Sequence, residues 1–89
     1  MKRYLIETLH KAEDCLKALD EELAIGPQVL GKFDYGCMEG DHTGYAIIDA
    51  ETREDAIRLV PTFLQTTAKI VEVGKYTPDM IRSFHKKAA

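Results

Sequence analysis

The stretch Tyr35-Gly36-Cys37-Met38-Glu39-Gly40-Asp41-His42-Thr43-Gly44-Tyr45 lies between two segments that favour β-structure. Residues 29–38 alternate with a period of two before it, and residues 44–50 read as a strand after it. Its glycines and aspartate are turn-forming residues. The stretch therefore predicts a β-hairpin.

Two turn lengths are compatible with this hairpin. A two-residue turn at Gly40-Asp41 places Tyr35 opposite Ala46, with Tyr45 on the other face of the sheet. A three-residue loop centred on Gly40 places Tyr35 beside Tyr45. The first has the better turn chemistry and the second gathers the aromatic side chains, so the register stays open.

The remaining segments alternate between strand and helix patterns. Apolar residues with helical spacing predict helices over 11–24 and 52–64, with the stripe of the first formed by Ala12, Cys15, Leu16, Leu19 and Leu23. Pro61 predicts a kink or break near Val60. Strands are predicted over 3–9 and 69–75, and Thr77-Pro78-Asp79 predicts the start of a terminal helix.

This order predicts an α+β fold: a single ferredoxin-like domain over residues 1–89, βαββαβ, with a four-stranded antiparallel sheet and a short C-terminal helix. Both main helices are expected on one face of the sheet, with Tyr4 and Ile6 beneath them. Leu5, Glu7 and Leu9 then lie on the other face. Because that face is not polar, a second copy of the chain is expected to cover it in a homodimer.

Composition narrows the class of protein. The 89 residues are 45% hydrophobic and 30% charged with a net charge of -3, which is typical of a globular protein. The basic residues are scattered except for Lys86 and Lys87, so no nucleic-acid partner is expected. Glu7 and His10 interrupt the first apolar run too early for a signal peptide, and neither a membrane partner nor a disulfide is expected in a cytoplasmic chain.

The run from Gly36 to Ala46, with Pro61-Thr62-Phe63-Leu64 and Thr77-Pro78 downstream, resembles a family of small uncharacterised bacterial proteins within the dimeric α+β barrel superfamily. The resemblance implies two ferredoxin-like sheets packed face to face, and it carries over no catalytic residues. Superfamily relatives include cofactor-free isomerases and oxygenases, haem-handling enzymes, effector-binding domains and a nickel-binding group. The resemblance therefore does not choose a function.

The expected function is small-molecule binding in a pocket between the two sheets. A carboxylate on an apolar sheet face is costly unless water or a partner reaches it, which singles out Glu7. Tyr35 and Tyr45 are the expected ligand-binding aromatics, with His42 at a tip, residues 40–44, that gates the pocket. Alternatives are a cofactor-free isomerase-like or oxygenase-like enzyme with Glu7 as base, and a structural or interaction module without a cavity. No cofactor is expected.

Metal chemistry is the remaining possibility. Cys37, Glu39, Asp41 and His42 fall within six residues and could ligate a transition metal, but ordinary turn residues and a solvated histidine explain them as well, so no metal site is assigned. A thiol nucleophile at Cys37 would need His42 within hydrogen-bond reach. His10 and His85 are expected at the surface or a dimer edge, and Cys15 is expected in the helix core as an inert apolar residue.

Overall fold

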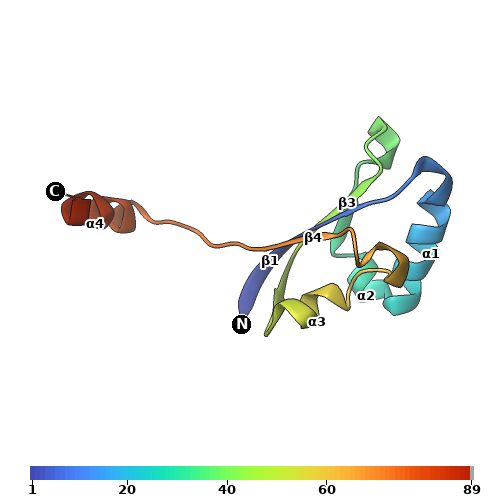
Figure 1. Ribbon diagram of the computed structural model, residues 1–89, viewed down its shortest axis with the longest axis horizontal. Coiled ribbons are helices and arrows are strands. Elements are labelled where there is room, and N and C mark those ends of the chain that lie inside the picture. Colours follow the sequence, from blue (N-terminus) through green and yellow to red (C-terminus); the bar gives the residue numbers. More distant parts are fainter. Residues whose placement is uncertain (89) are drawn as a thin grey trace.

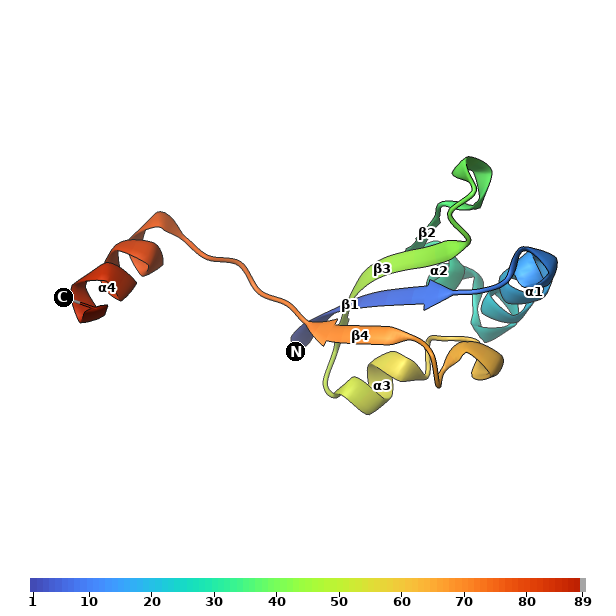
Figure 2. The ribbon, with the colours of Figure 1, turned by 45° about the horizontal axis from the view of Figure 1, so that its top comes forward.

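A computed structural model, which describes residues 1–88, shows an α+β fold built on a four-stranded antiparallel sheet (Figures 1 and 2). The strand order is β2-β3-β1-β4, with helices interleaved between the strands along the chain. The strands are β1 (Lys2–Leu9), β2 (Phe33–Tyr35), β3 (Thr43–Ala50) and β4 (Lys69–Glu72).

The helices lie between the strands and after the last of them. They are α1 (Cys15–Ile25), α2 (Pro27–Leu30), α3 (Arg53–Ile57) and α4 (Pro78–Ala88), with 3-10 turns η1 (Ala12–Asp14), η2 (Cys37–Glu39) and η3 (Thr62–Leu64). The Thr52 hydroxyl accepts a hydrogen bond from the Asp55 amide at 3.1 Å and so caps the start of α3. The predicted second helix is broken before Pro61, as expected, into α3 and η3.

The two faces of the sheet differ sharply in burial. Even-numbered residues such as Tyr4, Ile6 and Ile48 are buried, and Ala18 of α1 and Ala56 of α3 belong to the same core. Odd-numbered residues of β1 and β3 form the opposite side, called the outer face below, where Leu9 and Ile47 are exposed. The predicted division of β1 into inward Tyr4 and Ile6 and outward Leu5, Glu7 and Leu9 is confirmed.

The predicted strand over 29–38 is largely wrong. Pro27 occupies the first position of α2, a position that favours proline, so the chain continues as a short helix before β2 begins at Phe33. After Tyr35 the backbone forms η2 instead of extending the ladder. Gly40 follows η2 in the left-handed region (φ 83°), which glycine adopts without strain.

The hairpin register differs from both expected turn lengths. Tyr35 pairs with Gly44, so a longer loop containing η2 joins β2 to β3. A Cβ at Gly44 would lie only 2.8 Å from Cε1 of Tyr35, and glycine therefore makes room for the ring on the inner side of the sheet. Tyr45 points to the outer face.

The buried side of α1 also differs from the expected stripe. Ala18 and Glu22 are buried, whereas Leu16 and Leu23 are exposed. Ala18 and Glu22 are four residues apart, which is a helical spacing as good as that of the leucines and rotated by one residue around the axis. The sheet therefore receives a small residue and a carboxylate where leucines were expected.

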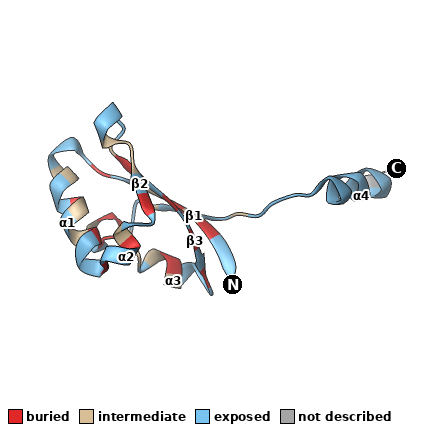
Figure 3. Ribbon diagram, turned by 180° about the vertical axis from the view of Figure 1, so that it is seen from behind, coloured by how far each residue is buried: buried red, intermediate tan, exposed pale blue. Residues whose placement is uncertain are grey.

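The last segment leaves the body of the molecule. Beyond β4 an extended linker leads to α4, and residues 73–88 together are called the arm below (Figure 1). The described residues of α4 are exposed along its length (Figure 3). The arm stretches the molecule to 53 × 28 × 22 Å. No helix in the described part of the chain is long and apolar enough to span a membrane.

Candidate metal centre

The end of the β1–β3 ladder brings two histidines together. The His10 amide donates a hydrogen bond to the His42 carbonyl at 2.9 Å, which continues the antiparallel pairing one step beyond Leu9 and Thr43. His10 follows Tyr4, Ile6 and Thr8 on the inner side of the sheet and is only 5% exposed. The two imidazole rings meet edge to face, with their centroids 5.5 Å apart.

Two cysteines approach the same point from other elements. Cys15 is the first residue of α1, which begins just after β1, and Cys37 is the first residue of η2. The Cys37 Sγ atom lies 3.5 Å from Nε2 of His10. Both thiols are free and half-buried. His10, Cys15, Cys37 and His42 are called the Cys2His2 cluster below.

The geometry of the Cys2His2 cluster suits a tetrahedral metal ion. One ligand atom from each of the four residues lies within 4.8 Å of every other. A tetrahedral zinc ion, with bonds of about 2.3 Å to sulfur and 2.0–2.1 Å to nitrogen, separates its ligand atoms by roughly 3.3–3.8 Å. Side-chain movements of about 1 Å would therefore close the cluster around an ion.

The electrostatics of the metal-free cluster favour neutral side chains. Burial, together with the neighbouring His42, lowers the pKa of His10, so its imidazole is neutral at pH 7, which is the form that ligates a metal. Burial and the adjacent Cys15 thiol raise the pKa of Cys37. A divalent cation would supply the positive charge that two thiolates require.

Two imidazole nitrogens in the cluster have no hydrogen-bond partner. The Nδ1 atoms of His10 and His42 are both buried and unpaired in the structure. Burying such an atom without a partner costs about 1–3 kcal/mol, and most buried polar atoms in proteins are satisfied. Each histidine of the cluster therefore has one ring nitrogen that no described protein group occupies.

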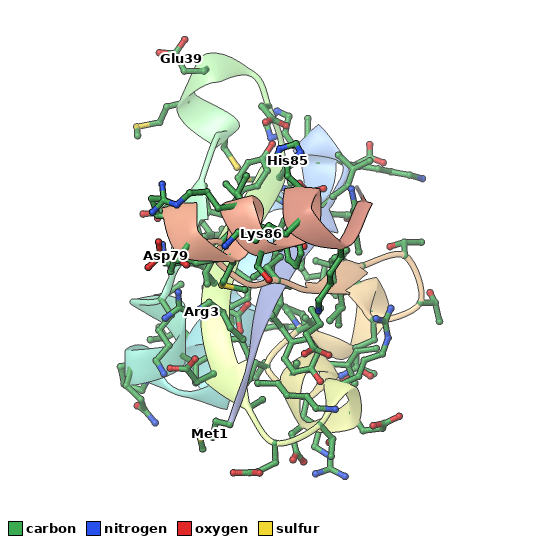
Figure 4. The ribbon with its side chains drawn as sticks, turned by 90° about the vertical axis from the view of Figure 1, so that its left-hand side faces the viewer. Met1, Arg3, Glu39, Asp79, His85 and Lys86 are labelled. Atoms are coloured by element: carbon green, nitrogen blue, oxygen red, sulfur yellow. The ribbon has the colours of Figure 1, made fainter. Side chains whose placement is uncertain are left out.

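The predicted site residues separate into two regions. Cys37 and His42 join the cluster, whereas Glu39 points away from the body at the end of the β2–β3 loop (Figure 4). Asp41 accepts hydrogen bonds from Thr43 Oγ1 at 2.7 Å and from the Tyr45 hydroxyl at 2.5 Å. These bonds lower the pKa of Asp41, the Tyr45 bond most of all. The two carboxylates that were considered as possible ligands, Glu39 and Asp41, are thus outside the cluster.

The two tyrosines, whose relative placement the sequence left open, lie on opposite faces of the sheet. Tyr35 lies on the inner side of the sheet and Tyr45 on the outer face. Tyr35 is half-buried, and burial, with smaller effects from Glu22 and the two thiols, raises its pKa. Glu7 lies on the outer face between Tyr45 of β3 and Lys69 of β4. Glu7 and Tyr45 are therefore the two expected ligand-binding residues that share a surface.

His10 and Cys15 are the members that sequence reasoning missed. The expectation of a surface histidine is wrong, because His10 continues the even-numbered alternation of β1 into the buried side. Cys15 was expected to be inert core, yet it lies beside Cys37. A signal was present in the spacing: His10 precedes Cys15 by five residues and Cys37 precedes His42 by five. The antiparallel pairing of β1 with β3 brings these two halves together.

Comparison of the chain with protein-family models, with curated proteins and with solved structures gave no match. The chemistry of the Cys2His2 cluster rests on the four residues themselves.

Proposed function

We propose that this chain is a transition-metal-binding protein that holds one ion, Zn²⁺ foremost, in the Cys2His2 cluster. The observation that carries the proposal is the convergence of two thiols and two imidazoles within 4.8 Å. Thiolate and imidazole ligands select zinc and its soft or borderline neighbours over magnesium or calcium. Four protein ligands leave no open coordination position, so the ion has a structural, storage or sensing role and no catalytic one.

The access of solvent to the cluster and the elements that hold its residues both agree with this proposal. Three of the four residues are half-buried, so an ion can reach the cluster from solvent without unfolding the core. Their backbones are held by β1, β3, α1 and η2, which restrict the positions of the ligands. A small domain of this length also gains from a metal cross-link, because its own core buries a limited share of its surface.

The test is a metal titration of reduced, chelator-treated protein. Co²⁺ is expected to give intense d–d bands of a tetrahedral site and thiolate charge-transfer bands that saturate at one equivalent. Zn²⁺ is expected to displace it. Cys15→Ser, Cys37→Ser and His10→Ala are each expected to weaken Zn²⁺ binding by more than about 100-fold, beyond the 10–100-fold typical of changes outside the ligand set.

Matched control variants separate this site from the surface residues. His85→Ala removes an exposed histidine and Glu39→Gln removes the loop carboxylate, and neither is expected to change affinity or spectrum. A Co²⁺ spectrum without thiolate bands, or one that Cys15→Ser leaves intact, would refute the cluster as the binding site. Loss of binding in Glu39→Gln would transfer the site to the β2–β3 loop.

We infer a second candidate function at the outer face, where a small molecule would bind against Glu7 and Tyr45. The observation that favours this function is that Glu7 and Tyr45 pair directly across β1 and β3, on a surface where neighbouring apolar side chains are exposed. The strand order β2-β3-β1-β4 supports the finer description of the fold as ferredoxin-like, and a second copy of the chain, the partner expected for a dimeric α+β barrel, would enclose this face. Native mass spectrometry should show a bound mass that Glu7→Gln loses and Asp49→Asn retains. Purified protein carrying only metal would refute this candidate.

A further inference from the structure

The arm presents an apolar side that its own chain leaves uncovered. Met80, Ile81 and Phe84 recur at helical spacing on α4, and Phe84 is 48% exposed. Tyr76 of the linker packs edge to face on Phe84, with ring centroids 5.8 Å apart, and extends this side. The charged residues Asp79, Arg82 and Lys86 lie on the other side of the helix. An isolated amphipathic helix of 11 residues is marginal in water, so packing must stabilise it.

The outer face of the sheet carries a matching apolar row. Leu5 pairs with Ile47 on one side and with Val71 on the other, so the three side chains form a line across the strands. Ile47 is 60% exposed. Glu7 and Tyr45 lie two residues further along the same strands, beside the row. The chain therefore exposes both the apolar side of α4 and the apolar outer face of the sheet.

The chain exposes more surface than a compact monomer of its mass. The chain exposes 6325 Å², whereas a compact monomer of its 10.0 kDa mass exposes roughly 5,200 Å². The excess, roughly 1,100 Å², exceeds the 800 Å² or so that each partner buries in a standard interface. The radius of gyration of 16.2 Å likewise exceeds the roughly 12 Å of a compact chain of this length.

The arm and the body of the chain carry opposite net charges, which favours a second copy as the occupant. Residues 77–89 contain Arg82, Lys86 and Lys87 against Asp79, a net charge of +2, which leaves -5 on residues 1–76. A basic helix is thus attached to an acidic body. Figure 4 shows α4 lying across the front of the molecule, with Asp79, His85 and Lys86 labelled on it.

We propose that two copies of this chain exchange arms, with α4 of each packed on the outer face of the other. The direction of the linker favours the exchange. The Val73 amide donates to the Arg3 carbonyl at 2.9 Å, and residues 73–77 then run away from the sheet, a reach of roughly 16 Å. To cover its own outer face, α4 would have to reverse that direction. A two-fold axis repeats each helix-on-sheet contact, so the arrangement is closed.

Light scattering tests the assembly, in reducing buffer with and without one equivalent of Zn²⁺. The parent chain is expected at twice its 10.0 kDa mass. Ile81→Asp and Phe84→Asp on the arm, and Ile47→Asp on the outer face, are expected at the monomer mass with unchanged β-sheet circular dichroism. Ser83→Asp adds the same charge to the arm away from its apolar side and is expected to remain dimeric. A monomeric parent, or dimeric Ile81→Asp, Phe84→Asp and Ile47→Asp, would overturn the exchange.

Photo-cross-linking then identifies which chain receives the arm. A benzophenone amino acid replaces Tyr76, and equal amounts of ¹⁴N-labelled and ¹⁵N-labelled chains are mixed, unfolded, refolded and irradiated. Exchange predicts cross-links from the arm to peptides of β1 and β3, half of them joining differently labelled chains. Cross-links found only within one chain would show that α4 folds back on its own sheet, and the proposal would fail.

Discussion

The Sγ atom of Cys37 lies 3.5 Å from Nε2 of His10, although 27 residues separate them in the chain. The contact depends on the β1–β3 register, which continues to His10 and His42, and on η2, which returns the chain toward the sheet. No local motif contains both residues. The Cys2His2 cluster is therefore a product of tertiary structure.

Zinc binding is expected to release about two protons at pH 7, because both thiols must become thiolates. The raised pKa of Cys37 keeps that thiol protonated before binding, and the lowered pKa of His10 means that this histidine contributes no proton. Affinity should fall as pH falls, since protons compete for all four ligands. Calorimetry in buffers of different ionisation enthalpy measures the proton count. A value near zero would contradict thiolate ligation.

Glu22→Gln is expected to stabilise the protein above neutral pH. Glu22 is fully buried, both carboxyl oxygens lack partners, and burial raises its pKa to about 7 from 4.5. The unfolded chain therefore loses this proton first as pH rises. The free energy of unfolding should fall between about pH 4.5 and 7, by on the order of 3 kcal/mol, and the variant should lack this loss.

Urea unfolding at pH 4.5 and pH 8 measures this difference between variant and parent. Asp20→Asn removes an exposed carboxylate from the same helix and serves as the control, with little expected change at either pH. Equal stability of Glu22→Gln and parent at pH 8 would show that the carboxylate has a partner.

The threonine caps of α3 and α4 have the same geometry but are expected to contribute differently to the free energy of unfolding. Thr52 accepts a hydrogen bond from the Asp55 amide, and Thr77 accepts one from the Met80 amide, each at 3.1 Å. Thr52→Ala should lower the free energy of unfolding of the domain by about 1 kcal/mol, because α3 belongs to the core.

Thr77→Ala should instead reduce the helicity of α4 and weaken association, while the unfolding of the monomeric Ile81→Asp background stays the same. Circular dichroism and chemical denaturation of both variants distinguish these effects. If Thr77→Ala destabilised the Ile81→Asp domain as much as Thr52→Ala does, α4 would have to pack on its own body.

Tyr45→Phe is expected to raise the pKa of Asp41 toward its ordinary value. The Tyr45 hydroxyl is the main cause of the lowered pKa, with Thr43 second. A carboxyl group whose pKa is lowered by folding stabilises the folded state only at pH values where it is ionised. Any stability that the variant loses should therefore be seen above the pKa of Asp41 and should disappear in acid. Carboxyl chemical shifts followed by NMR measure the pKa, and an unchanged value would show that the hydrogen bond is absent in solution.

The elements that the sequence predicts well are those with strong local signals. The alternation of β1 and the Thr77-Pro78-Asp79 helix start both depend on neighbouring residues. The region from Pro27 to Gly40 was predicted poorly, because Pro27 can either end a helix or begin one. The register after Tyr35 depends on η2, whose residues have no distinctive turn signature.

The sequence singled out only the second half of the candidate site, and no metal was assigned to it. Cys37 and His42 stand close in the sequence, whereas His10 and Cys15 enter through the pairing of β1 with β3. The correct inner assignment of Tyr4 and Ile6 already implied that His10 faces inward. Assigning Cys15 required knowing which side of α1 meets the sheet, and two stripes with equal spacing compete there.

The Cys2His2 cluster also has a consequence for chain topology. A metal ion joining His10 to His42 would close a loop that contains the whole of α1, α2 and β2. Such a cross-link restricts the loop whenever it unfolds, alone or with the rest of the domain, and the entropic effect grows slowly with loop length. Loading with Zn²⁺ should therefore slow hydrogen exchange in α1, α2 and β2, which lie inside the loop, more than in α3. The ion would therefore protect backbone amides with which it makes no contact.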